Sequence, residues 1–587
     1  MKLKSVILLT FFLTATLLLS CSKETNSNTD IATSVALDNK YIKPNSKDSA
    51  DTSTSPIINT YRDDINAAIE TTEKIEYSQE DYYKDWVNLD PEYIKLTGSS
   101  AIISGNGAKI KGNTITITKA GIYTISGQLD NGRIFVNLDK SGIVRLVLND
   151  AKINNSDESP IFVKKAEKVI ISLEKKTENI ISGTSNNKKS ALLEAQNAAI
   201  YSSAPLTING TGSLTVNAYS CNGVTSLDTV KITDGNLTVN SSGDALTGYD
   251  RVAANGGIIN INTGKNGIIS TNKTDSSKGL IELDGGKFTI TAGIDGIQSE
   301  NTLIITGGEF DITNSNTASK SHGLSAKSNL TINGGTFTID TVDDALTCDD
   351  SITINSGNLT LSSKKSGIHA NSSLNVTNGH INISQSNTGI DSGIITVLDG
   401  NIHLSARDYG IKLTTSKREH YLAVNGGWIK IDAENNAMDI DGTFFLTNGT
   451  VITDGQLINS KGTISKNENL DISGGLFVAA GSQISLTPSN KSTQYTIIYH
   501  YPEIIQSKKL CHLADNKNNS IMTFSPDKEY DTLVFSSPDL TQNKPYFLYL
   551  GGTATGNNTD GLFIDSIYRK GKLLLNFTLS NTFSILN

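Results

Sequence analysis

Acidic residues recur at one position of a repeated unit in this 587-residue chain, and they are the first candidates for chemistry. Clustered carboxylates, together with the carbonyl oxygens of turns, offer the roughly six to eight oxygen ligands that Ca²⁺ prefers. Aspartate is equally a common turn residue that caps strands through local hydrogen bonds, and this alternative applies to every one of these positions. The predicted calcium ligands are Asp244, Asp295, Asp343 and Asp344, with Asp349 and Asp350 in the turn that follows.

Aromatic and basic residues in the same units suit the recognition of sugars, whose C–H faces pack on flat rings while their hydroxyl groups bond sideways. Trp428 takes an outward position where other units carry Lys, Glu, Thr, Asn or His, with packing beneath a neighbouring loop as the alternative. Tyr249 and Tyr409 lie near predicted corners, and Lys412 is predicted to stack one coil above Asp391. We therefore predict that these three aromatic residues and Lys412 contact carbohydrate.

Catalysis is the competing interpretation of the same units. A polysaccharide lyase needs a Lys or Arg base beside a calcium-bound uronate, although basic residues on a strand face are more often only solvated charges. A glycosidase needs two opposed carboxylates at a fixed separation, which the sequence does not define. We therefore expect a protein that binds polysaccharide without cutting it, and keep a lyase as the alternative. The basic residues available to a lyase are Lys364, Lys365, Arg407, Lys412 and Arg418.

A repeat of about 22 residues must position these side chains. Leu283–Ile290, Ile305–Ile312, Ile332–Ile339 and Val424–Ile431 follow one plan, in which a Gly-Gly pair precedes an alternation of apolar and polar residues. Such alternation is typical of strands with one buried face. Because no amphipathic helical stretch separates the strands, the repeat predicts an all-β fold, a parallel β-helix with three short strands in each coil.

Each repeat also carries a polar–small–apolar triplet, as in Asp244–Leu246 and His322–Leu324. The small residue suits a tight corner, and the apolar residue is predicted to fill the core. The polar residues should then form a column along the outside of that corner. In the unit that begins at Leu330, we expect Leu330, Ile332, Phe337, Ile339 and Leu346 to point inward and Thr331, Thr336 and Thr338 to point outward.

The first residues predict a membrane-anchored protein. Residues 1–20 begin with lysines and continue as an apolar run that is short for a bilayer span and ends in small residues, like a secretory signal peptide. Leu18–Cys21 resembles the lipobox of bacterial lipoproteins, in which the cysteine is lipidated, and an ordinary signal peptide with a chance cysteine is the alternative. Acyl chains at Cys21 would hold the protein on the cell envelope, where we expect surface exposure.

The remaining chain divides by composition. Polar residues 21–84 predict a flexible tether, residues 85–487 the β-helix, and residues 488–587 a small β cap over its open strand edge. The net charge of -9 argues against a nucleic-acid partner. The three other cysteines lack any close spacing, so we expect buried thiols rather than disulfides or a zinc site; they are Cys221, Cys348 and Cys511.

Residues from about 85 to 220 resemble the start of a bacterial family of carbohydrate-binding β-helix proteins, first described in a cellulose-degrading clostridium. Ser537–Leu540 resembles the family's ending, so the resemblance extends to about Gly552. It implies a right-handed β-helix that binds cellulose or acidic, pectin-like polysaccharide, with calcium bound to it, and it does not imply catalysis. Related folds include pectate lyases, and a structural or adhesive stalk is a further alternative. The segments that carry the resemblance are Ile94–Gly98, Asn113–Ile117, Ala120–Gly127, Val144–Asn149, Ala198–Ser202 and Leu206–Leu214.

Overall fold

A computed structural model describes residues 74–586, except 84, 185–196, 316–319, 415–419, 456–461 and the side chains of 466–468. The predicted signal peptide, Cys21 and most of the predicted tether lie outside these residues. Residues 73–587 form one compact unit. Within the described ranges the one helix is a short 3₁₀ turn, η1 (Gln79–Asp81), and no helix is long and apolar enough to cross a membrane.

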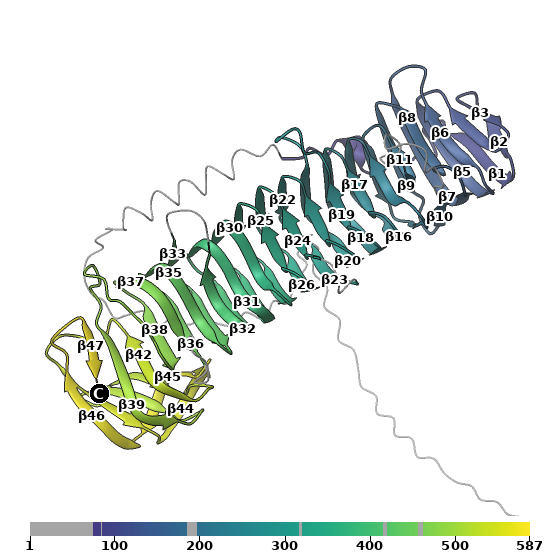
Figure 1. The fold of residues 1–587 in the computed structure, drawn as a ribbon. Helices are drawn as coiled ribbons and strands as arrows, with labels where there is room; N and C mark the ends of the chain where they lie inside the picture. The colour runs from purple at the N-terminus through teal and green to yellow at the C-terminus, as the bar shows by residue number, and fades with distance from the viewer. Residues whose placement is uncertain are drawn as a thin grey trace, which may run out of the picture. The chain divides into compact units, whose positions relative to one another are not determined.

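Three strands make each coil of a β-solenoid, and equivalent strands of successive coils pair in parallel. The described residues form about 14 turns. The paired strands create three sheets, called here faces one, two and three in the order in which the chain passes through them. In Figure 1 the strands of successive coils lie side by side from β8 to β38. The predicted all-β solenoid with parallel coils is confirmed.

The strands that belong to a single face are short. Face one contains β8 (Ile161–Lys165), β11 (Ala198–Ser202), β14 (Asn222–Ser226), β17 (Leu246–Gly248), β19 (Ile268–Ser270), β21 (Ile297–Ser299), β24 (Leu324–Ala326) and β27 (Leu346–Cys348). Face two contains β9 (Lys168–Leu173), β12 (Leu206–Gly210), β15 (Thr229–Ile232), β22 (Thr302–Ile305), β25 (Asn329–Ile332), β28 (Ser351–Ile354) and β33 (Tyr421–Val424). Face three contains β10 (Glu178–Gly183), β13 (Ser213–Ala218), β16 (Asn236–Ser241), β23 (Glu309–Asn314), β26 (Thr336–Thr341), β29 (Asn358–Ser363), β34 (Trp428–Ala433), β36 (Thr450–Asp454) and β38 (Leu476–Gly481).

Longer strands turn a corner and contribute to two or three faces. These are β18 (Arg251–Thr263), β20 (Leu280–Ala292), β30 (Ser366–Val376), β31 (His380–Val397), β32 (Asn401–Leu413), β35 (Asn436–Leu446) and β37 (Ile464–Ile472). The first coils are formed by β1 (Glu92–Gly98), β2 (Ala101–Ser104), β3 (Ala108–Lys111), β4 (Thr114–Ile117), β5 (Gly121–Leu129), β6 (Arg133–Asn137) and β7 (Ile143–Asn155).

One continuous apolar core fills the solenoid, because apolar residues alternate with polar ones along each strand. Equivalent core residues stack directly: the rings of Phe288, Phe310 and Phe337 lie 4.8 Å apart and nearly parallel. The predicted orientations are confirmed in the coil that contains β25 and β26. There Leu330, Ile332, Phe337, Ile339 and Leu346 are buried, whereas Thr336 and Thr338 are exposed and Thr331 is half-buried.

The turn between faces two and three requires its second glycine. Gly335 has φ +104°, a backbone conformation that side chains with a Cβ atom rarely adopt. A Cβ atom there would also lie 3.1 Å from the carbonyl oxygen of Gly308 in the preceding coil. The Gly-Gly repeat in the sequence therefore marks a turn at which neighbouring coils approach closely.

The last described part of the predicted tether lies against face two. Asp81 is fully buried and forms ion pairs with Lys168 and Lys231. The backbone N–H of Ile75 donates to a carboxylate oxygen of Glu282 at 2.7 Å. Residues 74–83 thus contact several successive coils, although the sequence assigns them to a flexible segment.

A C-terminal module follows the last coil. It closes the open edge of face three, because β42 (Tyr530–Ser536) pairs antiparallel with β38. The strands β39 (Thr496–Ile505) and β47 (Phe583–Leu586) extend this sheet. A second, six-stranded sheet contains β40 (Cys511–Asp515), β41 (Ser520–Phe524), β43 (Pro545–Leu550), β44 (Thr553–Thr559), β45 (Leu562–Arg569) and β46 (Lys572–Thr578). Cys221, Cys348 and Cys511 are buried, as predicted.

Candidate functional site

The polar residues of the triplets form a hydrogen-bonded column at the corner between faces three and one. Asn222 Oδ1 accepts the backbone N–H of Asp244 at 2.9 Å, and Asp244 Oδ1 accepts that of Asn266 at 3.1 Å. The series continues when Asn266 Oδ1 accepts the N–H of Asp295 at 3.1 Å and Asp295 Oδ1 accepts that of His322 at 2.8 Å. The predicted corner column is confirmed, and its side chains are buried or half-buried, each capping the next coil.

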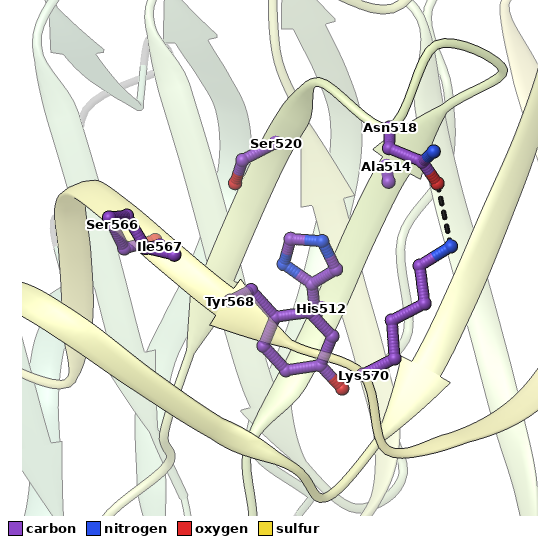
Figure 2. Close-up of a pocket in the computed structure, with 8 residues that line it drawn as sticks. All are labelled: His512, Ala514, Asn518, Ser520, Ser566, Ile567, Tyr568 and Lys570. Carbon is purple, nitrogen blue, oxygen red and sulfur yellow. Dashed lines mark hydrogen bonds between the residues drawn. The ribbon is translucent and has the colours of Figure 1, made fainter.

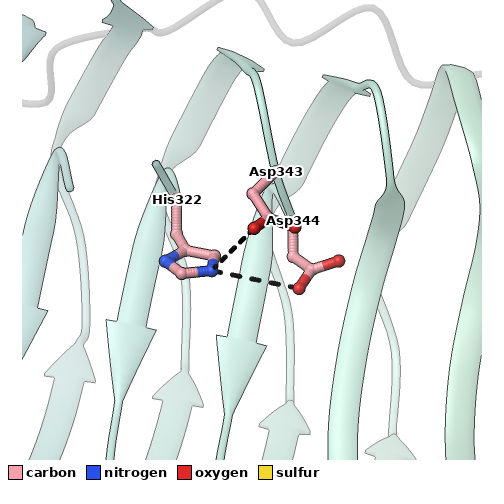
Figure 3. A group of neighbouring side chains, drawn as sticks. All are labelled: His322, Asp343 and Asp344. Atoms are coloured by element: carbon pink, nitrogen blue, oxygen red, sulfur yellow. Dashed lines mark ion pairs between the residues drawn. The ribbon is translucent and has the colours of Figure 1, made fainter. Parts of the chain in front are cut away.

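A group of charged side chains continues this column where β24 and β27 begin (Figure 3). The imidazole of His322 lies between carboxylates, with Nδ1 2.9 Å from Asp295 Oδ1 and Nε2 3.8 Å from Asp343 Oδ2. The ammonium group of Lys365 lies 2.8 Å from Asp344 Oδ2 and 3.2 Å from Asp343 Oδ1. Asp344 is only 1% exposed, so its carboxylate is held almost entirely by protein partners.

The charged residues extend along the outward positions of face one. Asp391 stacks on His369 in the parallel register, with His369 Nδ1 3.4 Å from Asp391 Oδ2. Lys412 stacks on Asp391 as the sequence predicts, and its ammonium group lies 4.8 Å from the ring centre of Tyr409. We call this set the charged strip. It comprises Asp295, His322, Asp343, Asp344, Lys365, His369, Asp391, Tyr409 and Lys412.

The carboxylates of the charged strip favour protonation of its basic groups. For His322, burial opposes the charged form, but the hydrogen bond with Asp295 and its charge outweigh this and raise the pKa. For His369, the hydrogen bond with Asp391 is the largest cause of a raised pKa, and burial acts against it. Burial likewise opposes the charge on Lys365, yet the contact with Asp344 raises its pKa. The strip therefore alternates cations and anions along face one.

The group around Asp343 fits a divalent cation in part. One ligand atom from each of His322, Asp343 and Asp344 lies within 4.8 Å of the others. The two carboxylates are suitable oxygen donors for calcium, whereas an imidazole nitrogen is not. Lys365 competes for the same oxygens, since its ammonium group contacts both carboxylates. A calcium ion here would need Lys365 to move and further oxygens to complete its shell.

The structure separates the other predicted calcium ligands from this group. Asp349 and Asp350 are exposed at the opposite end of β27, and Asp349 lies 3.8 Å from Lys327. Asp244 belongs to the corner column four coils before Asp344, where Asn266 Nδ2 donates to it at 2.8 Å. A calcium role for these three aspartates stays a prediction.

The predicted sugar contacts also lie apart. Tyr409 and Lys412 share one strand of face one, whereas Tyr249 is exposed at the far corner of that face, seven coils earlier. Trp428 lies on face three, half-buried against the C-terminal module, and its indole N–H donates to Asp560 at 2.7 Å. The observed contacts of Trp428 are therefore structural, and its role as a sugar platform stays a prediction.

Two histidines at the centre of the strip are absent from the sequence-based list of site residues. His322 occupies the polar position of a triplet, which the corner column already marks. His369 occupies the outward position two residues after Gly367, a position that becomes visible only when all triplets are aligned. A search for titratable residues at these two positions of every repeat would have found both.

The basic residues available to a lyase differ in their surroundings. Lys365 contacts two carboxylates that raise its pKa, so it is a poor base at neutral pH. Lys364 and Arg407 are exposed, and Arg418 lies outside the described residues. The two carboxylate contacts therefore suit Lys365 to act as a cation.

A family model described as carbohydrate-binding domain-containing protein matches residues 111–367 and 359–494, which together cover more than half of the chain. The chain belongs to this carbohydrate-binding domain family. The matched residues include every member of the charged strip. The matched residues lie mainly in the solenoid and end near the start of the C-terminal module.

Two known proteins are similar to parts of the chain. A carbohydrate-binding domain-containing protein of Acetivibrio thermocellus is 37% identical over 137 residues, which are 23% of this chain and 48% of that protein. The chain thus spans about half the length of this curated relative. A solved structure described as a polysaccharide lyase-like protein from C. thermocellum is 28% identical, with a TM-score of 0.37, and the match covers 46% of this chain and 100% of that one.

Proposed function

We propose that the solenoid binds polysaccharide, cellulose or an acidic pectin-like polymer, along the charged strip on face one and does not cleave it. The observation that carries this proposal is the stacking of charged side chains from successive coils in a line within a carbohydrate-binding domain. Parallel coils repeat about every 4.8 Å, so the five steps from Asp295 to Lys412 extend over roughly 24 Å. This length suits several sugar units in a row.

The strip has the chemistry that such a polymer requires. Carboxylates accept hydrogen bonds from sugar hydroxyl groups, whereas Lys365, Lys412 and protonated His369 donate to hydroxyl or carboxylate oxygens. The ring of Tyr409 adds an apolar surface for a sugar C–H face. Uronate carboxylates would be attracted by these three cations, and the neighbouring aspartates would repel them unless a cation lies between.

Calcium would supply such a cation. In this proposal the carboxylates of Asp343 and Asp344 hold the ion, and sugar oxygens complete its shell. Lys365 would leave these oxygens when calcium binds. Chelation should therefore weaken the binding of an acidic polymer more than the binding of cellulose.

The direction of the pKa shifts in the strip supports binding without cleavage. A lyase requires a base that takes a proton next to the uronate carboxylate. Neighbouring carboxylates raise the pKa of both Lys365 and His369. Incubation with pectate and calcium should therefore give no unsaturated product, and the appearance of its absorbance would establish the lyase instead.

A pull-down on insoluble cellulose and on pectate gel tests the binding surface. With a chelator present, the double variant Lys365→Gln/Lys412→Gln should lose about tenfold in affinity for pectate, which corresponds to about 1.4 kcal/mol. Lys287→Gln is the matched control, because Lys287 is an exposed lysine on face three that is paired with Glu309 at 3.0 Å. Equal losses in the control and the double variant would reject face one as the binding surface.

A separate variant tests the prediction that the indole ring of Trp428 on face three contacts sugar. Trp428→Ala removes the indole, and equal binding by this variant and the wild type would reject a sugar contact there. Trp428→Phe keeps a ring but removes the hydrogen bond to Asp560, so it separates the loss of a platform from a loosened C-terminal module.

The proposed cellular setting is a lipid anchor at Cys21 on the cell envelope. The lipobox-like residues before Cys21 support it. Labelling of cells with a radioactive fatty acid should mark the wild-type protein, and Cys21→Ser should abolish the label. A labelled serine variant, or an unlabelled wild type, would contradict the anchor.

A further inference from the structure

The C-terminal module contains a pocket that lies on a different sheet from the charged strip (Figure 2). Its volume is about 270 Å³, slightly below the range of roughly 300–1,000 Å³ that is usual for sites of drug-sized ligands. The pocket therefore has room for one small ring rather than for a segment of polymer. It is lined by His512, Ala514, Asn518, Ser520, Ser566, Ile567, Tyr568 and Lys570.

Two stacked rings form the centre of the pocket. The rings of His512 and Tyr568 lie 3.8 Å apart and are nearly parallel. Two hydrogen bonds hold the hydroxyl group of Tyr568. It donates to the carbonyl of Gly551 at 2.7 Å and accepts the N–H of Gly571 at 2.9 Å. Burial, followed by the charge of Lys570, lowers the pKa of His512 to about 4, so the imidazole is neutral at pH 7.

Hydroxyl groups surround the histidine. His512 Nδ1 lies 2.8 Å from the hydroxyl of buried Thr523. The same hydroxyl is 3.1 Å from that of Ser566 and 3.3 Å from that of Ser520. These groups form a rigid polar wall, and the serine hydroxyls can turn toward a ligand because each can donate and accept.

The opposite side of the pocket carries one positive charge. Lys570 donates to Asn518 Oδ1 at 2.7 Å, and its ammonium group lies 5.4 Å from the ring centre of Tyr549. Neither partner carries a charge that could neutralise the ammonium group. Figure 2 shows Asn518 and Lys570 on one side of the stacked rings and Ser566 and Ile567 on the other. Ile567 is 72% exposed, so it offers an apolar edge at the rim.

We propose that this pocket binds a single carboxylated sugar unit, with the carboxylate on Lys570, the hydroxyl groups on Ser520 and Ser566, and the ring edge against Ile567. A charge-assisted hydrogen bond fixes the acid group, and the neighbouring hydroxyls distinguish a sugar acid from a simple carboxylate. The site is independent of the charged strip, because it takes one unit or a chain end whereas the strip takes a polymer.

Isothermal titration of the full folded chain with a hexuronic acid, the matched neutral hexose and acetate tests the site. The uronate should bind about tenfold more tightly than either the hexose or acetate. Only the uronate has both a carboxylate for Lys570 and hydroxyl groups for Ser520 and Ser566. Lys570→Gln should remove the preference for uronate over hexose. Lys572→Gln is the matched control, because Lys572 is exposed in the same module and does not line the pocket.

A second variant fills the pocket without removing a charge. Ser520 is exposed, so Ser520→Trp should leave the fold intact while it blocks uronate binding. Equal affinities for uronate and acetate would show a site for simple anions and would overturn the proposal, as would failure of the wild type to bind the uronate. Binding of pectate by the strip should survive in Lys570→Gln, so failure of one site is distinguishable from failure of the other.

Discussion

Faces one and three are built from the same coils, yet they expose their side chains differently. Asp340 and Asp344 lie four residues apart in one coil, Asp340 at the end of face three and Asp344 at the corner before face one. Asp340 is exposed and accepts one hydrogen bond, from Ser362 at 3.0 Å. Asp344 is buried, accepts the backbone N–H of Ser366 at 3.0 Å and contacts Lys365.

The strands of the two faces differ in length and exposure. The face-one strand β27 has three residues, and its outward Thr347 is half-buried. The face-three strand β26 has six residues, and its outward Thr336 and Thr338 are open to water. Charged residues on face one therefore form a series of partly buried contacts, whereas the pair Lys287–Glu309 on face three is exposed. This is the physical reason to place selective binding on face one.

The largest effect is expected from the interior that both faces share. Phe310→Ala removes the middle ring of the Phe288–Phe310–Phe337 stack and should lower the free energy of unfolding by about 3–5 kcal/mol. Asp311→Ala, one residue further and exposed on face three, should change it by less than about 0.5 kcal/mol. Chemical denaturation checks both. A mild effect of Phe310→Ala would mean that the coils do not stack in register.

A smaller effect compares the two aspartates directly. Asp344→Ala leaves the N–H of Ser366 without its acceptor and should cost about 2 kcal/mol, mainly from this buried hydrogen bond to a charged group. The contact with Lys365 adds little, since that lysine is 58% exposed. Asp340→Ala should be nearly neutral. Similar losses of unfolding free energy in both variants would contradict the claim that Asp344 is stabilised by buried contacts that Asp340 lacks.

The proposed calcium site gives an effect of about tenfold in affinity, or about 1.4 kcal/mol. Lys365→Gln removes the cation that competes for Asp343 and Asp344, so calcium should bind about tenfold more tightly, as measured by titration calorimetry. Lys287→Gln on face three should leave calcium affinity unchanged. If Lys365→Gln binds calcium no better than the wild type, the two carboxylates do not hold the ion.

The smallest effect is the pH dependence of stability contributed by face one. The folded pKa values of His322 and His369 are raised above the ordinary value of about 6.5. Their stabilisation is therefore complete below about pH 6.5 and is lost as the pH rises through the folded pKa values. Unfolding measured from pH 6 to 9 should show that the difference between wild type and His322→Gln/His369→Gln shrinks as pH rises. A constant difference would contradict the ion pairs.

The features of the molecule that the sequence predicts are those that follow from its repeat. The alternation around Leu330 and the triplets predict the core positions and the corner column, because each depends only on a residue's place in its coil. The stacking of Lys412 on Asp391 follows from the same register. These features recur from coil to coil. A residue that is hard to assign to the inside, the outside or a corner in one repeat can therefore be assigned by aligning that repeat with the others.

Contacts outside the repeat could not be predicted in this way. Asp560 reaches Trp428 from a turn 132 residues later in the chain, and Asp81 docks on Lys231 from 150 residues earlier. Neither contact follows from a residue's place in a coil. The partition of Lys365 between Asp343 and Asp344 likewise depends on distances of a few tenths of an ångström, which no spacing in the sequence encodes.

Hydroxyl-radical footprinting with a bound oligosaccharide tests the central claim most directly, because it reads both faces in one experiment. Radical oxidation of His369 and Tyr409 on face one should fall several-fold when an oligouronate is added with calcium. Oxidation of His380, an exposed histidine on face three, should not change. Protection of His380 with no change at His369 and Tyr409 would contradict polysaccharide binding along the charged strip.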